Sequence, residues 1–235
     1  MPSGARPKLH IVILRIRVFS NKPSQKLQSQ THLHSIPFPP ISYPSLPISK
    51  NPTIITMTIP QPLFQPTLIS KEVTSSLPAD FTIRPLERND YAKGFLECLK
   101  VLTHIGNVTE EKFHERYDWM DTQAKGGYYV LVIENEEERI VGTGVLLVER
   151  KFIHDLGTIG HIEEISITKE HQGKGLGQKM INGLDSVAQA IGCYKTILNC
   201  SVKNEGFYVK CGFKNGGGLE MSHYFEEPKS AYESG

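Results

Sequence analysis

Proline and acidic residues divide this 235-residue chain near residue 77. Thirteen of the 15 prolines lie at or before Pro78, and no acidic residue precedes Glu72. Proline lacks a backbone donor and is excluded from helix interiors and central strands. We therefore expect residues 1–76 to be a disordered, basic, Pro/Ser-rich extension. Residues 77–228 then form one domain of ordinary size, and residues 229–235 form a flexible tail.

The formal net charge of +1 conceals opposite charges in the two parts. Residues 1–71 carry eight Lys or Arg and no Asp or Glu, whereas the rest carries 18 basic against 25 acidic residues, a net charge of −7. An acidic domain argues against general nucleic-acid binding. The basic extension is compatible with a mitochondrial targeting segment, a disordered tail, or translated upstream sequence absent from the native protein, because Met57 offers an internal start.

The cysteines show neither a metal-binding nor a disulfide pattern. Cys98, Cys193, Cys200 and Cys211 have no CxxC spacing, so we expect reduced thiols, a cytoplasmic protein and no metal site. No apolar run approaches the ~18 residues of a membrane-spanning helix, and we therefore exclude membrane insertion.

Hydrophobic periodicity after Phe81 predicts an α+β domain in the order β-α-α-β-β-β-α-β-α-β. The predicted strands cover residues 81–86, 128–133, 140–151, 161–168, 193–200 and 219–225. The predicted helices run from Asn89 or Asp90 to near Gly106, from Thr109 past Met120, from Leu176 to Ile191, and from Glu205 to Cys211. The strands at 128–133 and 140–151 should form a hairpin.

One predicted strand contains an irregularity. In HIEEISIT the apolar residues are Ile162, Ile165 and Ile167, a spacing of three followed by two. A regular strand has a period of two, so one extra residue must lie near Glu163 and Glu164. This spacing predicts a β-bulge.

A glycine-rich turn opens the helix that follows this strand. Its residues are Gln172, Gly173, Lys174, Gly175, Leu176 and Gly177. Unpaired N–H groups and the helix dipole at such a turn suit a phosphate or pyrophosphate. The spacing matches neither a Walker loop nor the GxGxxG of dinucleotide-binding folds. A tight strand-to-helix turn without a ligand is the alternative.

Several sequence blocks together resemble the GNAT superfamily of acetyl-CoA-dependent N-acetyltransferases. Within it, the likeness is greatest to the fungal and animal glucosamine 6-phosphate N-acetyltransferases. The blocks are LKVLTHIGNVT (99–109), VERKFIHDLGTIGHIEEI (148–165), QGKGLG (172–177), GCYKTILNC (192–200) and NEGFYVKCGF (204–213). The resemblance implies a GNAT fold, in which helices flank a twisted, mixed, mostly antiparallel sheet with a bulged strand. It also implies direct acetyl transfer in a ternary complex on the route to UDP-N-acetylglucosamine, and a homodimer whose sugar site the partner completes, with the C-terminal strand involved.

The resemblance assigns acetyl-CoA to three parts of the chain. The glycine turn, Gln172 to Gly177, would hold the pyrophosphate. Ile165, Ser166 and Ile167 would pair with the pantetheine arm, and an N–H there would polarise the thioester carbonyl. Asn204 would contact the cofactor, and Tyr208 would protonate or stabilise the departing thiolate. A tyrosine of the core is the alternative for Tyr208.

The resemblance places the sugar phosphate at a further set of residues. They are Thr103, Arg150, Lys151, Glu163, Glu164 and Asn199. Glu164 and Asn199 would act beside Tyr208 in catalysis, while Arg150 and Lys151 would hold the phosphate. Solvated surface charge is the alternative for the basic pair and for one of the glutamates.

Two departures from the family pattern bear on these roles. The family usually has aspartate at the position of Asn199, so a role that needs a carboxylate is lost while that of the main-chain carbonyl survives. Some members carry a basic residue near the C-terminal strand, where this chain has Ser222, His223 and Tyr224. An acetyltransferase acting on a protein N-terminus, a lysine or a polyamine, and a non-catalytic CoA-binding relative, remain alternatives.

Overall fold

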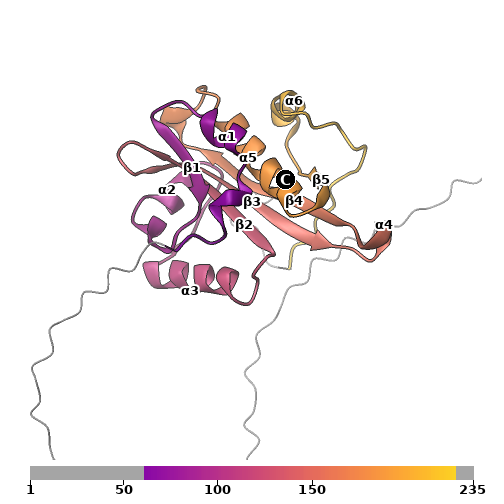
Figure 1. Ribbon diagram of the computed structural model, residues 1–235, viewed down its shortest axis with the longest axis horizontal. Coiled ribbons are helices and arrows are strands. Elements are labelled where there is room, and N and C mark those ends of the chain that lie inside the picture. The colour runs from indigo at the N-terminus through magenta and orange to yellow at the C-terminus, as the bar shows by residue number, and fades with distance from the viewer. Residues whose placement is uncertain (1–60, 226–235) are drawn as a thin grey trace, which may run out of the picture. The chain divides into compact units, whose positions relative to one another are not determined.

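The structure of the protein is a computed structural model that describes residues 61–225 (Figure 1). The predictions for residues 1–60 and 226–235, including the tail at 229–235, lie outside the described residues. The described part is built on one five-stranded sheet in the order β1-β2-β3-β4-β5. The strands are β1 Phe81–Pro85, β2 Tyr128–Asn135, β3 Ile140–Arg150, β4 Thr158–Ile167 and β5 Cys193–Ile197.

Strand pairing confirms the predicted mixed, mostly antiparallel sheet. Strands β1 to β4 pair antiparallel in chain order, and β5 pairs parallel to β4. The predicted hairpin of β2 and β3 is also confirmed. A parallel pair needs a crossover connection, which α5 supplies between β4 and β5.

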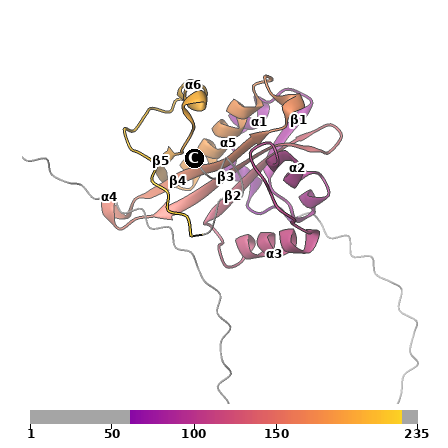
Figure 2. The ribbon, with the colours of Figure 1, turned by 180° about the vertical axis from the view of Figure 1, so that it is seen from behind.

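Helices cover both faces of the sheet (Figures 1 and 2). Helix α5 (Leu176–Ala190) with α1 (Lys71–Ser75) covers one face, and α2 (Phe95–Leu99) with α3 (Glu110–Asp121) covers the other. The remaining elements are α4 Ile153–Leu156, α6 Val202–Lys210, and the 3-10 helices η1 Pro66–Leu68, η2 Arg88–Tyr91 and η3 Lys169–His171. No helix within residues 61–225 is long and apolar enough to cross a membrane.

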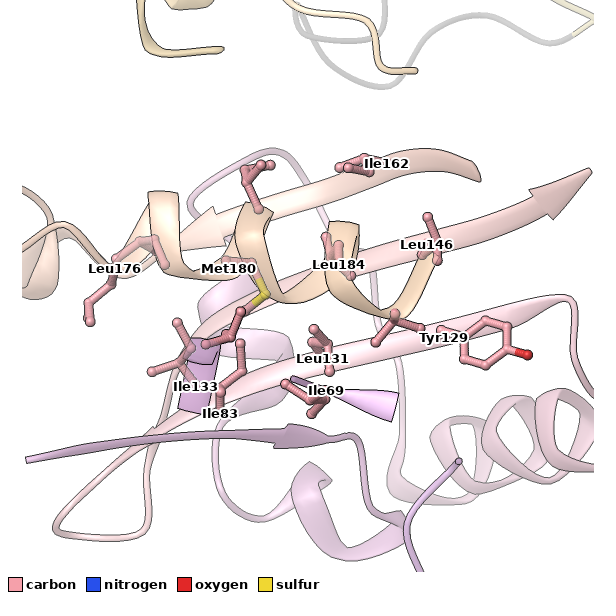
Figure 3. Close-up of a cluster of buried hydrophobic side chains, with 14 of the residues drawn as sticks. Ile69, Ile83, Tyr129, Leu131, Ile133, Leu146, Ile162, Leu176, Met180 and Leu184 are labelled. Atoms are coloured by element: carbon pink, nitrogen blue, oxygen red, sulfur yellow. The ribbon is translucent and has the colours of Figure 1, made fainter. Parts of the chain in front are cut away.

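Helix α5 packs an apolar stripe across the middle of the sheet (Figure 3). Leu176, Met180 and Leu184, spaced four residues apart, are at most 1% exposed. They belong to one core cluster with side chains of β1, β2 and β3, among them Ile83, Leu131, Ile133 and Leu146. Burying each such side chain stabilises the fold by about 2 kcal/mol. The stripe thereby fixes the N-terminal end of α5 relative to the sheet.

Helix α3 begins where the sequence predicts. Thr109 is its N-cap, and the hydroxyl oxygen accepts a hydrogen bond from the N–H of Lys112 at 3.4 Å. Phe113 and Tyr117 are buried in a second core cluster, with Phe95 of α2. The two clusters occupy opposite faces of β2, which explains why this strand is an unbroken apolar run.

The domain begins earlier than the predicted boundary at residue 77, so the expectation of disorder is wrong for residues 61–76. Leu63, Ile69 and Val73 are buried in the core. The Ser70 hydroxyl caps α1 by accepting from the N–H of Val73 at 3.3 Å. Pro66 lies in the first turn of η1, where its missing donor is tolerated.

Three further predictions need correction. The helix expected from Asn89 or Asp90 to near Gly106 is divided into η2 and α2, because Gly94 adopts a left-handed φ of +91° between them. The strand predicted for residues 193–200 ends at Ile197, and four residues separate it from α6, which begins at Val202. Residues 219–225 form no strand, because no other strand within residues 61–225 pairs with them.

A buried ionic network joins β1, η2 and β2. The Arg84 guanidinium donates to both carboxylate oxygens of fully buried Asp90, at 2.9 and 2.8 Å. It also donates to Glu134 at 2.7 Å, and Lys93 donates to the other Glu134 oxygen at 2.7 Å. Burial alone would raise the pKa of Glu134, but these hydrogen bonds hold it below its ordinary value. Glu134 therefore stays ionised at neutral pH.

Candidate functional site

Strand β4 continues beyond its pairing with β5. The parallel register runs from Thr158 with Cys193 to His161 with Ile197, whereas β4 extends to Ile167. Residues 162–167 therefore pair with β3 on one edge, and no strand within the described chain pairs with the other edge. Backbone donors and acceptors on such an edge can bind an extended ligand.

The predicted bulge in β4 is confirmed: it interrupts the pairing with β3, in the part of β4 whose other edge is free. Thr143 pairs with Ser166 and Val145 with Glu163, so Gly144 alone opposes two residues, Glu164 and Ile165. Glu164 has a φ of +54°, a left-handed conformation that a residue with a side chain rarely adopts.

The bulge also brings two carboxylates to one face of the sheet. Ile162 and Ile165 pack with the core on the α5 side, and the two residues between them do not. Glu163 opposes Val145, which belongs to the α3-side cluster, and Glu164 interacts electrostatically with Arg116 of α3. On a regular strand these neighbours would point to opposite faces.

Both carboxylates have a raised pKa, although their side chains reach solvent. Partial desolvation is the main cause for each. For Glu163 the nearby charge of Glu164 adds to the rise, whereas His161 opposes it. A raised pKa makes a carboxylate a better proton acceptor near neutral pH.

The glycine turn lies between the end of β4 and α5. Gly173 and Gly175 have φ values of +77° and +80°, and a Cβ added at either would meet open space. The Gln172 side-chain amide donates to the Ile167 carbonyl at 3.0 Å, which ties the turn to the end of β4. N–H groups at the start of α5 thus face an uncrowded region suited to phosphate.

Local charge near this turn is positive despite the acidic domain. Residues 168–180 contain Lys169, Lys174 and Lys179 against the single acidic residue Glu170. Neighbouring cations favour an anionic ligand over the short range that salt screening leaves.

Helix α6 packs against the N-terminal end of α5. A Cβ on Gly177 would lie 3.2 Å from the Phe207 ring, so glycine permits this close approach. The Gln178 side-chain amide also donates to the Lys210 carbonyl at 3.4 Å. The half-buried Tyr208 ring lies near the rings of Phe207 and Phe213, with centroids 5.0 and 6.1 Å away. Asn204 is exposed one helical turn earlier.

The structure does not bring Arg150 and Lys151 together. The Arg150 guanidinium donates to the Gly126 carbonyl at 3.2 Å. The Lys151 ammonium instead donates to Glu149 at 2.6 Å, and Glu149 also contacts His161 at 2.9 Å. The two side chains therefore have different partners, and they form no joint clamp within residues 61–225.

The last two predicted site residues lie in loops. Asn199 is exposed two residues beyond the end of β5. Thr103 is half-buried in the loop between α2 and α3.

Comparison with known families decides the classification. The sequence model of the acetyltransferase (GNAT) family matches residues 90–213, more than half of the chain. The chain belongs to the GNAT acetyltransferase family. Its bulged, half-paired β4 and its glycine turn lie inside the matched region.

Individual relatives of this GNAT chain are similar over the same domain. A Candida albicans protein named glucosamine 6-phosphate N-acetyltransferase is 47% identical over 146 residues, covering 62% of this chain and 96% of the relative. An Arabidopsis thaliana protein of the same name is 40% identical, covering 62% and 97%. The crystal structure of glucosamine-6-phosphate N-acetyltransferase from Arabidopsis thaliana matches with a TM-score of 0.59 and 41% identity, covering 62% of this chain and 99% of that one.

Sequence reasoning missed several side chains of this GNAT site. Thr143, Cys98 and Phe207 contact the bulge or the glycine turn, and Glu149 contacts both Lys151 and His161. Thr143 could have been found from the sequence, because it is a hydroxyl residue inside the otherwise apolar run IVGTGVLLV. The others depend on contacts between distant segments.

Proposed function

We propose that this protein transfers the acetyl group of acetyl-CoA to the amine of D-glucosamine 6-phosphate, forming N-acetyl-D-glucosamine 6-phosphate and CoA for UDP-N-acetylglucosamine biosynthesis. One observation carries the proposal: the free edge of β4 leads directly to an open glycine turn at a helix N-terminus. An extended arm ending in a pyrophosphate fits that combination. The relatives' names supply the acceptor.

In this proposal acetyl-CoA lies along β4. The N–H groups of the glycine turn, Gln172 to Gly177, hold the pyrophosphate. The pantetheine arm pairs with the backbone of Ile165, Ser166 and Ile167, and Asn204 contacts the cofactor from α6. This arrangement aims the thioester at the bulge, where Glu163 and Glu164 lie.

The sugar phosphate lies on the α3-side face of β4 in this proposal. Glu163 and Glu164 bind ring hydroxyls and the amine, and Lys151 provides a cation for the phosphate. Asn199 contributes its main-chain carbonyl and a neutral amide at the end of β5, and Thr103 contributes a hydroxyl from its loop. Because Arg150 is turned toward Gly126, it reaches the phosphate only after a side-chain rearrangement.

The proposed chemistry is a direct transfer in a ternary complex. The neutral amine attacks the thioester carbonyl, and a backbone N–H of the bulged strand stabilises the negative charge that develops on oxygen. The carbon–sulfur bond then breaks, and Tyr208 donates its phenolic proton to the leaving thiolate. Glu164, whose pKa is raised by desolvation, accepts the proton that the amine loses.

Release of free thiol tests this function. Acetyl-CoA is mixed with the protein and glucosamine 6-phosphate, with glucosamine, or with a lysine peptide. We expect thiol release with the sugar phosphate to exceed that with either alternative by roughly 100-fold, because a lost phosphate contact leaves its binding groups unpaired. Release that stays at background with the sugar phosphate would refute the proposal. Background release with all three acceptors would favour a non-catalytic relative.

We also propose a homodimer held by the C-terminal segment, residues 219–225. Leu219, Met221 and Phe225 are almost fully exposed in the single chain, and this segment has no strand partner within residues 61–225. Unpaired strand edges and exposed apolar side chains favour association. The negative charge of Glu220 adds to the raised pKa of Glu163, so this segment passes near the face of β4 to which we assign the sugar.

Truncation tests the dimer. A chain ending at Gly218 should sediment as a monomer, whereas the full chain should sediment at twice its 26.4 kDa mass. A chain ending at Pro228 is the matched control and should remain dimeric. A monomeric full chain, or a dimer that survives truncation at Gly218, would contradict the proposal.

A further inference from the structure

We propose that Thr143 is a positioning residue for acetyl transfer, because its hydroxyl holds the β4 bulge in its active shape. The inference rests on the proposed function and adds a residue to it. The buried polar side chains of the described chain draw attention to the β4 bulge. Four polar or charged residues of the described chain are buried: Asp90, Glu134, Thr143 and Ser166. The first two form the Arg84 network, and the other two face each other across β3 and β4 beside the bulge.

The Thr143 hydroxyl compensates an unfavourable backbone conformation. Thr143 is 0% exposed, and its Oγ1 donates to the Glu164 carbonyl oxygen at 3.2 Å. Glu164 is the bulge residue with a φ of +54°. A left-handed residue other than glycine persists only where its surroundings hold it. The hydrogen bond from Thr143 links β3 to β4 at Glu164 and thereby holds this conformation.

A second pair of contacts holds β4 immediately after the bulge, against α2. The Ser166 hydroxyl donates to the Cys98 carbonyl of α2 at 2.6 Å, and the Cys98 thiol lies 3.8 Å from the Ser166 carbonyl. Burial raises the pKa of the Cys98 thiol to about 11, so the thiol remains a donor. Ser166 thus fixes the strand after the bulge, and Thr143 fixes the bulge itself.

The bulge determines two things that the reaction needs. It sets the direction of the N–H groups on the free edge of β4, and it places Glu163 and Glu164 on one face. Valine has the shape of threonine without the donor, so Thr143→Val leaves the Glu164 carbonyl without this bond. The bulge can then relax toward a regular strand, which moves both sets of groups relative to the thioester.

The expected signature is a loss in kcat without a matching loss in cofactor binding. Thr143→Val should lower kcat for glucosamine 6-phosphate roughly tenfold, because small misplacements of reacting groups are costly in rate. The Kd for acetyl-CoA should change less than about threefold, since the glycine turn holds the pyrophosphate independently. Thr143→Ser, which keeps the donor, should restore kcat to within about threefold.

Thr196→Val is the matched control. Thr196 also donates through its hydroxyl, to Asp185 at 2.7 Å, but it lies on β5 away from the bulge. The kcat of Thr196→Val should stay within about twofold of wild type, because the Thr196–Asp185 hydrogen bond involves no residue of the proposed site. Melting temperatures of all three variants identify any general loss of stability, and assays are run well below the lowest of them.

Backbone amide NMR provides a readout independent of the substrate. In Thr143→Val the signals of residues 164–166 should shift, while those of the glycine turn stay in place. Unchanged amide signals at 164–166, or wild-type kcat in Thr143→Val, would overturn the positioning role. So would equal losses in Thr143→Ser and Thr143→Val. Background thiol release by the wild-type protein would instead refute the proposed function. The amide shifts would still show whether the Thr143 hydroxyl holds the bulge.

Discussion

Replacing Tyr208 with phenylalanine is expected to lower kcat roughly 100-fold, since a positioned general acid contributes at least that factor. The Kd for acetyl-CoA should stay within about twofold of wild type, because the change removes one oxygen and keeps the ring. The ring contacts with Phe207 and Phe213 hold the side chain in place with or without the hydroxyl. Steady-state thiol release and calorimetric titration with acetyl-CoA measure the two quantities.

Tyr91→Phe is a matched control for the loss of a tyrosine hydroxyl. The Tyr91 hydroxyl donates to the Val108 carbonyl at 3.4 Å on the α3 side of the sheet, away from α6. Its kcat should remain near the wild-type value. A Tyr208→Phe variant with unchanged kcat would exclude the tyrosine as the proton donor. A kcat that falls in parallel with acetyl-CoA affinity would assign Tyr208 to binding alone.

Local sequence patterns predicted the central part of this site well. The spacing of Ile162, Ile165 and Ile167 located the bulge to within a residue, because strand periodicity is strict where one face is buried. The apolar stripe of α5 and the glycines before it likewise located the helix N-terminus. Both patterns reflect short-range geometry that a sequence records directly.

The failures arose where a contact between distant segments decides the outcome. Residues 61–76 were predicted to be disordered because of their prolines, yet Leu63, Ile69 and Val73 are buried in the core. Arg150 and Lys151 are neighbours in sequence, but their side chains bind different partners, Gly126 and Glu149. The segment 219–225 has the composition of a strand and lacks a partner strand within the described chain.

Net charge also gives a misleading picture of ligand binding here. The part of the chain from Glu72 onward carries a net charge of −7, yet both proposed ligands are anions. Screening at physiological salt limits each charge to about 8 Å, so the surroundings of the site matter more than the total. In the proposed function, the lysines around the glycine turn and the N-terminus of α5 provide that local attraction.

Removing the carboxylate of Asp90 is expected to destabilise the fold by about 3–5 kcal/mol, the usual cost of breaking a buried ion pair from one side. In Asp90→Ala the Arg84 guanidinium loses both bonds to that carboxylate and retains the carboxylates of Glu134 at 2.7 Å and Glu87 at 3.9 Å. The N–H of Glu87, which donates to Asp90 at 2.8 Å, loses its acceptor as well. Denaturant unfolding at neutral pH measures the difference.

A second arginine–aspartate pair a few residues away isolates the effect of burial. Arg88 also donates two hydrogen bonds to one carboxylate, from Nε and Nη2 to Asp118 at 2.9 and 3.2 Å, but the two side chains are 49% and 55% exposed. Water already solvates this pair, so Asp118→Ala should cost less than about 1 kcal/mol. Equal losses in the two variants would show that pair geometry, not burial, determines the stabilisation. A small loss in Asp90→Ala alone would mean that water enters and resolvates Arg84, and that the join between β1, η2 and β2 rests on the apolar core.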